Sequence, residues 1–217
     1  MRSLAQPAVL KSALIAGLLS AAVSYPRLSQ WHGSPYPLWY LESLLLVGAV
    51  VLWAFVFAWH TQYTRRPVFT LNFGWRLFAL TTASGLLLTL ALHWWVDPWL
   101  RAQAPQDYPA DLEQWLAMTL FSLAFTQLFL VVAPFAWLLR LSRGNTMAVP
   151  LTVLFGAVAL FVKFRSPSTP LPPGMFAALL AARLVLSLAS VYLLLRGGVL
   201  LVWWWGLLLQ GRLLFQP

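Results

Sequence analysis

Residues 115–140 read WLAMTLFSLAFTQLFLVVAPFAWLLR, and no charged residue occurs in this stretch before Arg140. A helix of this length rises about 39 Å at 1.5 Å per residue, which is enough to cross the roughly 30 Å hydrocarbon core of a bilayer. The stretch therefore predicts a transmembrane helix. It also places a polar pair, Thr126 and Gln127, in the middle of that helix, where polar groups are costly.

The composition of the whole chain agrees with this prediction. Of its 217 residues, 61% are hydrophobic and 9% are charged. A soluble domain with so few charged residues could not cover its own apolar surface, so we interpret the chain as an integral membrane protein in contact with the lipid bilayer. The absence of cysteine excludes disulfides, thiol nucleophiles and cysteine-based metal sites.

Windows of about 20 apolar residues predict further membrane-spanning helices. We expect an all-α bundle of about seven spans, within a range of six to eight, at residues 8–25, 38–59, 75–95, 115–139, 147–164, 175–195 and 198–214. The first span also resembles a secretory signal, but we expect it to be retained. We divide this single membrane domain into N-terminal helices with an acidic loop, residues 1–114, and a core, residues 115–217.

The basic residues are divided unequally between the two sides of the expected bundle. The N-terminal side carries Arg2, Lys11, Arg65, Arg66, Arg76, Arg140, Arg143 and Arg196, and the other side carries Arg27, Arg101, Lys163, Arg165 and Arg212. The positive-inside rule then favours a cytoplasmic N-terminus and an outward acidic loop, in a bacterial inner membrane. The net charge of +9 does not indicate a nucleic-acid partner, because the basic residues are scattered singly.

Motifs of intramembrane catalysis are absent from the sequence. No HExxH occurs, as a zinc protease would require, and no GxGD occurs, as in aspartyl intramembrane proteases. Ser84, in TTASGLL, faintly resembles the serine motif of rhomboid proteases, but those need a later histidine and none follows His93. We favour Ser84 as a small residue at a helix contact.

The histidines leave two interpretations open. His60 and His93 end successive helices, so antiparallel packing separates them and argues against paired haem ligation. His32, His93 and two acidic residues, Glu42 and Asp97, are expected near the outer surface. Together they are compatible with a metal site, but interfacial hydrogen bonding explains them more simply, and we predict no cofactor.

Two segments of the core resemble the CAAX protease and bacteriocin-processing family (CPBP, also called Abi). TQLFLVVAPFAWLLR resembles the family's first motif region, E-E-L-F-F-R-G-x-L-x-P-x-L, with Thr126 and Gln127 at the glutamate positions and Val131 at the arginine position. TVLFGAVALF resembles the F-x-x-x-H segment, with Phe155 matched and Ala159 at the histidine position.

A third segment, VYLLLRGGVLLVWWWGLLLQG, resembles the family's late Y-x-R-T-G-S-L run, and its compatible residues are Tyr192, Arg196, Gly198 and Leu200. The family's late histidine and asparagine would fall near Leu207 and Gly211, but no His follows His93 and no Asn follows Asn145. In active members, the resemblance implies, glutamates and histidines activate a water that attacks a peptide carbonyl.

The resemblance therefore implies a CPBP-like core that has lost its catalytic groups, since Thr126, Gln127, Val131 and Ala159 cannot replace glutamate, arginine and histidine. We expect a pseudoenzyme, acting as a scaffold or accessory subunit among other integral membrane proteins. The alternatives are a permease-like transporter subunit, with a path lined by Arg183, Gln127 and Glu42, and an active enzyme or intramembrane protease with an unrecognised site.

Four residues of the core are candidates for partner or lipid contacts. Arg183 lies in the middle of an expected span, where a charged side chain costs about 2.5–3.5 kcal/mol on insertion scales. Trp203, Trp204 and Trp205 fan their indoles over most of a helix circumference. Gln127 and Gln210 are expected to bridge helices through amide hydrogen bonds.

Overall fold

The computed structural model describes residues 4–31, 34–164 and 173–214, and it is helical throughout, with no strand in these ranges. The helices are α1 (Pro7–Ser29), α2 (Leu38–Phe55), α3 (Thr61–Thr64), α4 (Trp75–Trp95), α5 (Asp97–Gln103), α6 (Leu112–Phe121), α7 (Ala133–Ser142), α8 (Asn145–Phe164) and α9 (Pro173–Gly211). The prediction of an all-α bundle is confirmed.

Short turns of other helix types join or extend these helices. The π-helical turn η1 (Val56–His60) leads from α2 into α3, and two more, η3 (Ser122–Thr126) and η4 (Leu128–Val132), lead from α6 into α7. The 3-10 turns are η2 (Pro105–Asp107) and η5 (Arg212–Leu214). As a result, α2 to α3 and α6 to α7 each form one long membrane-spanning unit.

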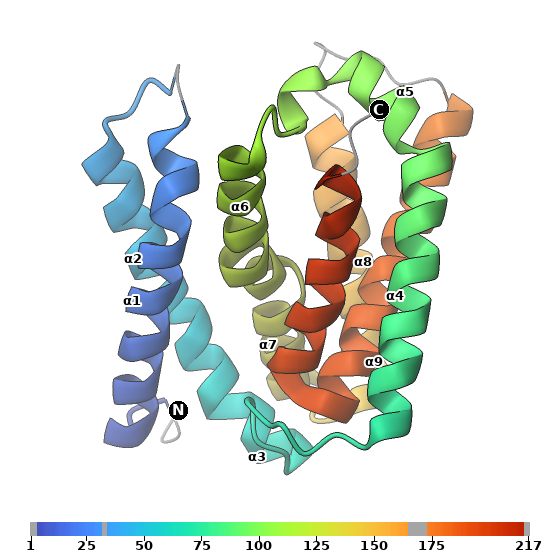
Figure 1. Ribbon diagram of the computed structural model, residues 1–217. Helices are drawn as coiled ribbons and strands as arrows, with labels where there is room; N and C mark the ends of the chain where they lie inside the picture. The colour runs from blue at the N-terminus through green and yellow to red at the C-terminus, as the bar shows by residue number, and fades with distance from the viewer. Residues whose placement is uncertain (1–3, 32–33, 165–172, 215–217) are drawn as a thin grey trace.

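Six described segments are long and apolar enough to cross a membrane: Pro7–Ser29, Leu38–Thr64, Trp75–Trp95, Leu112–Ser142, Asn145–Val162 and Gly174–Leu214. The last has 41 residues, about 61 Å of helix and twice the thickness of the hydrocarbon core. It is broken at Gly198, and Figure 1 shows its two halves running in opposite directions. We call residues 173–197 the first arm of α9 and residues 199–211 the second arm.

The bend between the arms depends on a glycine. Gly198 has φ 69° and ψ −170°, a conformation that is essentially restricted to glycine. A Cβ on it would lie 2.6 Å from the carbonyl oxygen of Val68, which accepts a hydrogen bond from the amide of Val199 at 3.0 Å. Arg66 donates from Nη1 to the carbonyl oxygen of Leu195 at 2.6 Å and so caps the end of the first arm.

The two ends of the bundle differ in charge. The start of α1 and the bend of α9 lie at one end of the molecule, and α5 and the end of the second arm of α9 lie at the other (Figure 1). Glu42 at the start of α2, three acidic residues between α4 and α6 (Asp97, Asp107 and Asp111) and Glu113 in the first turn of α6 share the end at which α5 lies. We call this the acidic end and the opposite one the basic end. His32, Arg2 and Arg165 lie outside the described residues.

The apolar core lies where α2, α7 and both arms of α9 meet. Its largest fully buried side chains include Trp53, Phe135, Leu139, Leu194 and Leu201. The α1–α2 hairpin forms one edge of the molecule and α4 the opposite edge, with α6 and α7 between them (Figure 1). Many large apolar side chains remain exposed on the outer helices, as is expected where helices contact lipid chains.

Candidate functional site

The polar pair lies at the junction of two π-helical turns. Thr126 ends η3, and Gln127 separates it from η4. Such turns are rare and are frequent at functional sites. The side-chain amide nitrogen of Gln127 lies 3.6 Å from the position that a Cβ on Gly206 would occupy, beside the second arm of α9. Val131, at the family's arginine position, is only 2% exposed and belongs to the apolar core.

Phe155 and Ala159, the two positions on α8 that were aligned with the family's F-x-x-x-H segment, lie away from Thr126 and Gln127. Phe155 packs its ring against Phe129, with 6.1 Å between ring centroids, in an apolar groove on the outer surface of α7 and α8. Ala159 is half-buried one turn further along α8. Neither residue lines the cavity that Thr126 lines.

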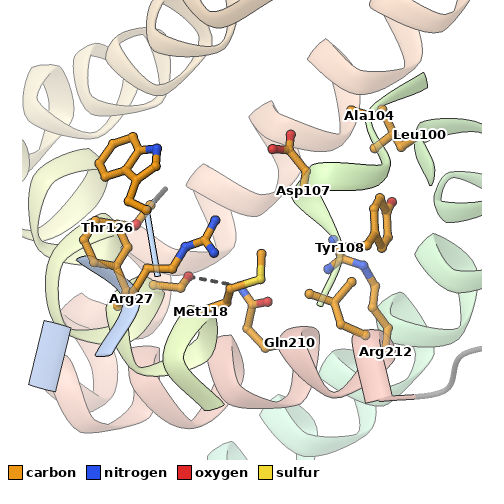
Figure 2. A pocket seen from close by; sticks show the side chains of 13 residues that line it. Arg27, Leu100, Ala104, Asp107, Tyr108, Met118, Thr126, Gln210 and Arg212 are labelled. Atoms are coloured by element: carbon orange, nitrogen blue, oxygen red, sulfur yellow. Dashed lines mark hydrogen bonds between the residues drawn. The ribbon is translucent and has the colours of Figure 1, made fainter. Parts of the chain in front are cut away.

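That cavity has a volume of about 530 Å³ and lies at the acidic end, between α1, the α5–η2 segment, α6 and the end of α9. We call it the acidic-end cavity (Figure 2). Its lining residues are Arg27, Trp31, Leu100, Ala104, Asp107, Tyr108, Met118, Phe121, Ser122, Thr126, Gln210, Arg212 and Leu213. Figure 2 shows Arg27 on one side of it and Tyr108 and Arg212 on the other.

One wall of the cavity is fixed by hydrogen bonds between α9 and the α6–η3 segment. Gln210 donates from Nε2 to the hydroxyl oxygen of Ser122 at 3.0 Å. Trp115 donates from its indole nitrogen to the carbonyl oxygen of Gln210 at 2.9 Å. The expectation that Gln210 bridges two helices is therefore confirmed, and such bonds contribute about 0.6 kcal/mol on average in membranes.

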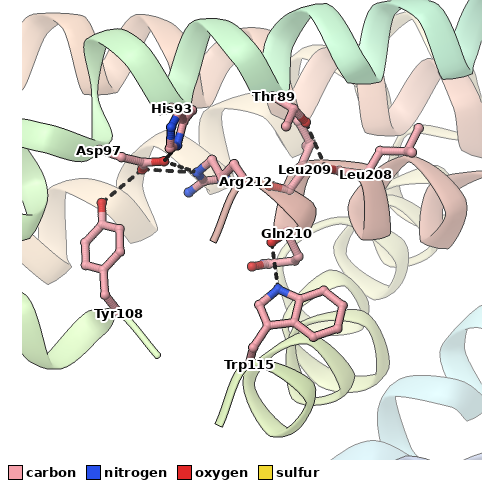
Figure 3. A network of polar contacts seen from close by, with 9 residues as sticks. All are labelled: Thr89, His93, Asp97, Tyr108, Trp115, Leu208, Leu209, Gln210 and Arg212. Atoms are coloured by element: carbon pink, nitrogen blue, oxygen red, sulfur yellow. Dashed lines mark hydrogen bonds and ion pairs between the residues drawn. The ribbon is translucent and has the colours of Figure 1, made fainter. Parts of the chain in front are cut away.

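On the side of the cavity that Tyr108 and Arg212 line, both side chains are bonded to one buried carboxylate, that of Asp97 (Figure 3). Asp97 is 2% exposed and accepts hydrogen bonds from Arg212 Nε, at 3.1 Å and 3.0 Å to its two oxygens. The hydroxyl of Tyr108 donates to Asp97 Oδ1 at 2.9 Å, and Nδ1 of His93 lies 4.0 Å from Oδ2. Burial, and then the Asp97 carboxylate, raises the pKa of Tyr108, so the phenol stays a donor. This carboxylate is engaged in holding the fold together.

The described residues of the metal-site interpretation are Glu42, His93 and Asp97. Within the described ranges, no group of three or more His, Asp or Glu side chains lies close enough together to hold a metal ion. His32 lies outside the described residues, and Asp97 is engaged by Arg212. His60 is buried at the basic end while His93 lies at the acidic end, as the sequence predicted.

Arg183 lies on the first arm of α9, facing α8. It donates from Nε to the carbonyl oxygen of Gly156 at a long 3.4 Å. Its Nη2 and the hydroxyl of Ser187 are buried and have no hydrogen-bond partner among the described residues. Neither Arg183 nor the other two residues of the transport alternative, Gln127 and Glu42, lines the acidic-end cavity.

The three tryptophans are accommodated largely inside the molecule. Trp203 packs edge to face against Trp53, with 6.4 Å between centroids. Trp204 donates from its indole nitrogen to the hydroxyl of Thr82 on α4 at 3.0 Å, and Trp205 is only 3% exposed. The second arm of α9 is central in the bundle, so these indoles contact helices of the same chain.

Ser84 faces away from the contact at which the sequence analysis placed it. It is exposed, and its hydroxyl donates to the backbone carbonyl of Thr81 at 3.1 Å. The small residue at the contact between α4 and α9 is its neighbour Gly85, where a Cβ would lie 2.8 Å from a methyl carbon of Leu208.

Sequence reasoning missed Arg27, Tyr108 and Arg212 as site residues. The only signal was their side of the membrane: Arg27 and Arg212 were placed on the same side as the acidic loop, which contains Asp97 and Tyr108. No protein-family model, curated protein or solved structure matches the chain. The fold itself defines the class of the protein, a polytopic helical membrane protein in contact with the bilayer.

Proposed function

We propose that this chain is a non-catalytic integral membrane protein, built on a CPBP-like core, that serves as a scaffold or accessory subunit of a membrane protein complex. The observation that supports this proposal most is the set of residues that line the acidic-end cavity together with Thr126. This residue, at the position of the family's first glutamate, lines the acidic-end cavity together with Gln210, which is next to the position assigned to the asparagine. A hydroxyl and an amide cannot act as general bases near neutral pH.

Two of the polar groups near Thr126, the Gln210 amide and the Asp97 carboxylate, are engaged in holding helices together. The Gln210 amide is bonded to Ser122, and the buried carboxylate of Asp97 is bonded to Arg212 and Tyr108. Hydrolysis needs a base that is free to accept a proton from water. The arrangement therefore favours a role in architecture over a role in chemistry.

A subunit role also accounts for Arg183. Its buried Nη2 has no hydrogen-bond partner within the described part of the chain, and the acidic residues gather at the acidic end. Charged groups inside membrane spans are costly unless they are paired. Arg183 as a whole is only half-buried, so an anionic group of a partner helix packed on the first arm of α9 would pair with its guanidinium once the side chain turned outward.

The proposed location is a bacterial inner membrane with the basic end in the cytoplasm. The described basic residues at that end are Lys11, Arg65, Arg66, Arg76, Arg140, Arg143 and Arg196, and those toward the acidic end are Arg27, Arg101, Lys163 and Arg212. Cytoplasmic loops carry the excess of Lys and Arg in such membranes.

The absence of catalysis is tested in liposomes that contain the purified chain and a library of fluorogenic peptides. We expect no hydrolysis above that of empty liposomes, and no change on Thr126→Ala or Gln127→Ala. Leu86→Ala, at an exposed position on α4, is the matched control. Hydrolysis that persists in the control but is lost in either of the other two variants would contradict the proposal.

A further inference from the structure

An apolar groove of about 600 Å³ lies beside the acidic-end cavity, between α1 and α6. One wall is a single face of α1 that includes Ile15, Leu19 and Val23; Leu123 stands opposite, and Trp53 and Trp203 form the back. Along α1 the lining extends from Ser12 to Val23, about 17 Å of helix. This length is close to half of the 30 Å hydrocarbon core.

The groove offers almost nothing to a polar ligand. The hydroxyl of Ser20, one of its few polar lining groups, already accepts a hydrogen bond from the indole nitrogen of Trp53 at 2.9 Å. A partner helix is about 10–12 Å across with its side chains, and it cannot enter between α1 and α6, which contact one another. A single acyl chain is narrow enough and needs no hydrogen bonds.

The groove and the acidic-end cavity follow one another along the same seam. On α1, Val23 lines the groove and Arg27 lines the cavity, and residues four apart share one helix face. On the opposite wall the two are side by side: Leu120, Leu123 and Ala124 line the groove, and Met118, Ser122 and Thr126 line the cavity from an adjacent face of the same helical unit. The apolar groove and the polar cavity therefore adjoin one another, and on α1 the change from one to the other occurs between Val23 and Arg27.

Arg27 supplies the charge at this junction. It is half-buried, and no hydrogen bond or ion pair of its guanidinium is found with any described residue, whereas Arg212 across the cavity is bonded to Asp97. Guanidinium groups bind phosphate oxygens through paired, charge-assisted hydrogen bonds. Arg27 contributes one positive charge to this junction, which balances a headgroup with a single negative charge.

From this arrangement we propose that the seam between α1 and α6 binds one phospholipid with a single negative charge, its phosphate at Arg27 and one acyl chain in the apolar groove. The site does not depend on the role as a subunit. It makes a specific lipid a structural component of the fold, because the lipid fills the space between the α1–α2 hairpin and the rest of the bundle.

The headgroup part of the proposal is tested by native mass spectrometry of the delipidated full chain in detergent, titrated with phosphatidylglycerol, phosphatidylcholine or inorganic phosphate. We expect one phosphatidylglycerol to bind at least tenfold more tightly than phosphatidylcholine, and Arg27→Gln to abolish this preference. Lys11→Gln, which removes a charge near the other end of the same helix, leaves it intact. Inorganic phosphate that binds as tightly as the lipid would overturn the proposal.

The chain part of the proposal is tested by filling the groove. Ile15→Trp is expected to weaken the binding of both lipids at least tenfold. Leu14→Trp should leave their binding unchanged, because Leu14 is similarly exposed (52% against 49% for Ile15) but does not line the groove. If Ile15→Trp fails to fold, Leu19→Trp takes its place. Unchanged lipid binding in the folded groove variant, or a peptide in place of a lipid captured by a photo-crosslinker at residue 15, would overturn the proposal.

Discussion

Arg212 donates from Nε to both carboxylate oxygens of Asp97, at 3.1 Å and 3.0 Å, across a sequence separation of 115 residues. Asp97 is the first residue of α5 and Arg212 is the first residue of η5. The pair therefore ties the end of the second arm of α9 to the segment that follows α4, and it closes the acidic end of the bundle.

Removing either member of this pair is expected to destabilise the protein. Asp97→Ala leaves a partly buried guanidinium without its carboxylate, and the cost of breaking a buried pair is about 3 kcal/mol. Unfolding titrations in mixed detergent micelles measure it. Glu113→Ala, at an exposed carboxylate, is the control, with a change of about 0.5 kcal/mol or less. Equal effects of the two variants would show that the pair does not stabilise the fold.

Tyr108 should give the protein a distinct response to alkaline pH. Burial, followed by Asp97, raises the pKa of its phenol in the folded state, while in the unfolded chain it titrates near its usual value of about 10. Below that pH both states hold the proton. Above it the unfolded state loses the proton first, so stability falls.

Wild-type protein is therefore expected to lose stability more steeply above about pH 10 than Tyr108→Phe, because the variant has no proton to lose at this position. Unfolding midpoints measured at several alkaline pH values test the difference. Tyr40→Phe, at an exposed tyrosine, should follow the wild-type curve. Parallel curves for wild type and Tyr108→Phe would contradict the burial-based explanation.

Gly198 should tolerate no side chain. Its φ of 69° strains an L-residue, which costs about 1–3 kcal/mol, and a Cβ would also approach the Val68 carbonyl oxygen to 2.6 Å. Gly198→Ala is expected to lower the free energy of unfolding by at least this amount. Gly48→Ala is the matched control, because a Cβ at Gly48 meets nothing within 4 Å and alanine favours helix by about 1 kcal/mol. A stabilising Gly198→Ala would show that the bend is not required.

The hydrogen bond between Ser122 and Gln210 is expected to hold helices together to a modest extent. A double-mutant cycle of Ser122→Ala and Gln210→Leu should give a coupling energy of about 0.6 kcal/mol, the average for such bonds in membranes. The indole of Trp115 bonds the backbone of residue 210, so that contact is retained in both variants. A coupling energy indistinguishable from zero would show that this bond does not stabilise the helix contact.

Hydropathy was sufficient to place the helices. The expected spans 38–59 and 75–95 correspond to Leu38–Thr64 and Trp75–Trp95, and the expected break between 195 and 198 corresponds to the bend at Gly198. These features are local, because a run of apolar residues and a glycine pair are visible in the sequence itself.

Contacts between helices far apart in the chain could not be predicted from the sequence. Nothing near Asp97 identifies Arg212 as its partner. The indoles of Trp203 to Trp205 were expected to contact partners or lipid, because the central position of the second arm was not visible in the sequence. The π-helical turns around Gln127 also leave no sequence signal, since their hydrogen-bond pattern depends on the packing of α6 and α7 against their neighbours.

The central claim is that the chain works as a non-catalytic member of a membrane complex. Its most direct test is the mass of the particle extracted in a mild detergent, with identification of every polypeptide that co-migrates. The account predicts a particle heavier than one 24.4 kDa chain, containing another integral membrane protein in fixed stoichiometry. A stable monomer accompanied by lipid alone would contradict the claim.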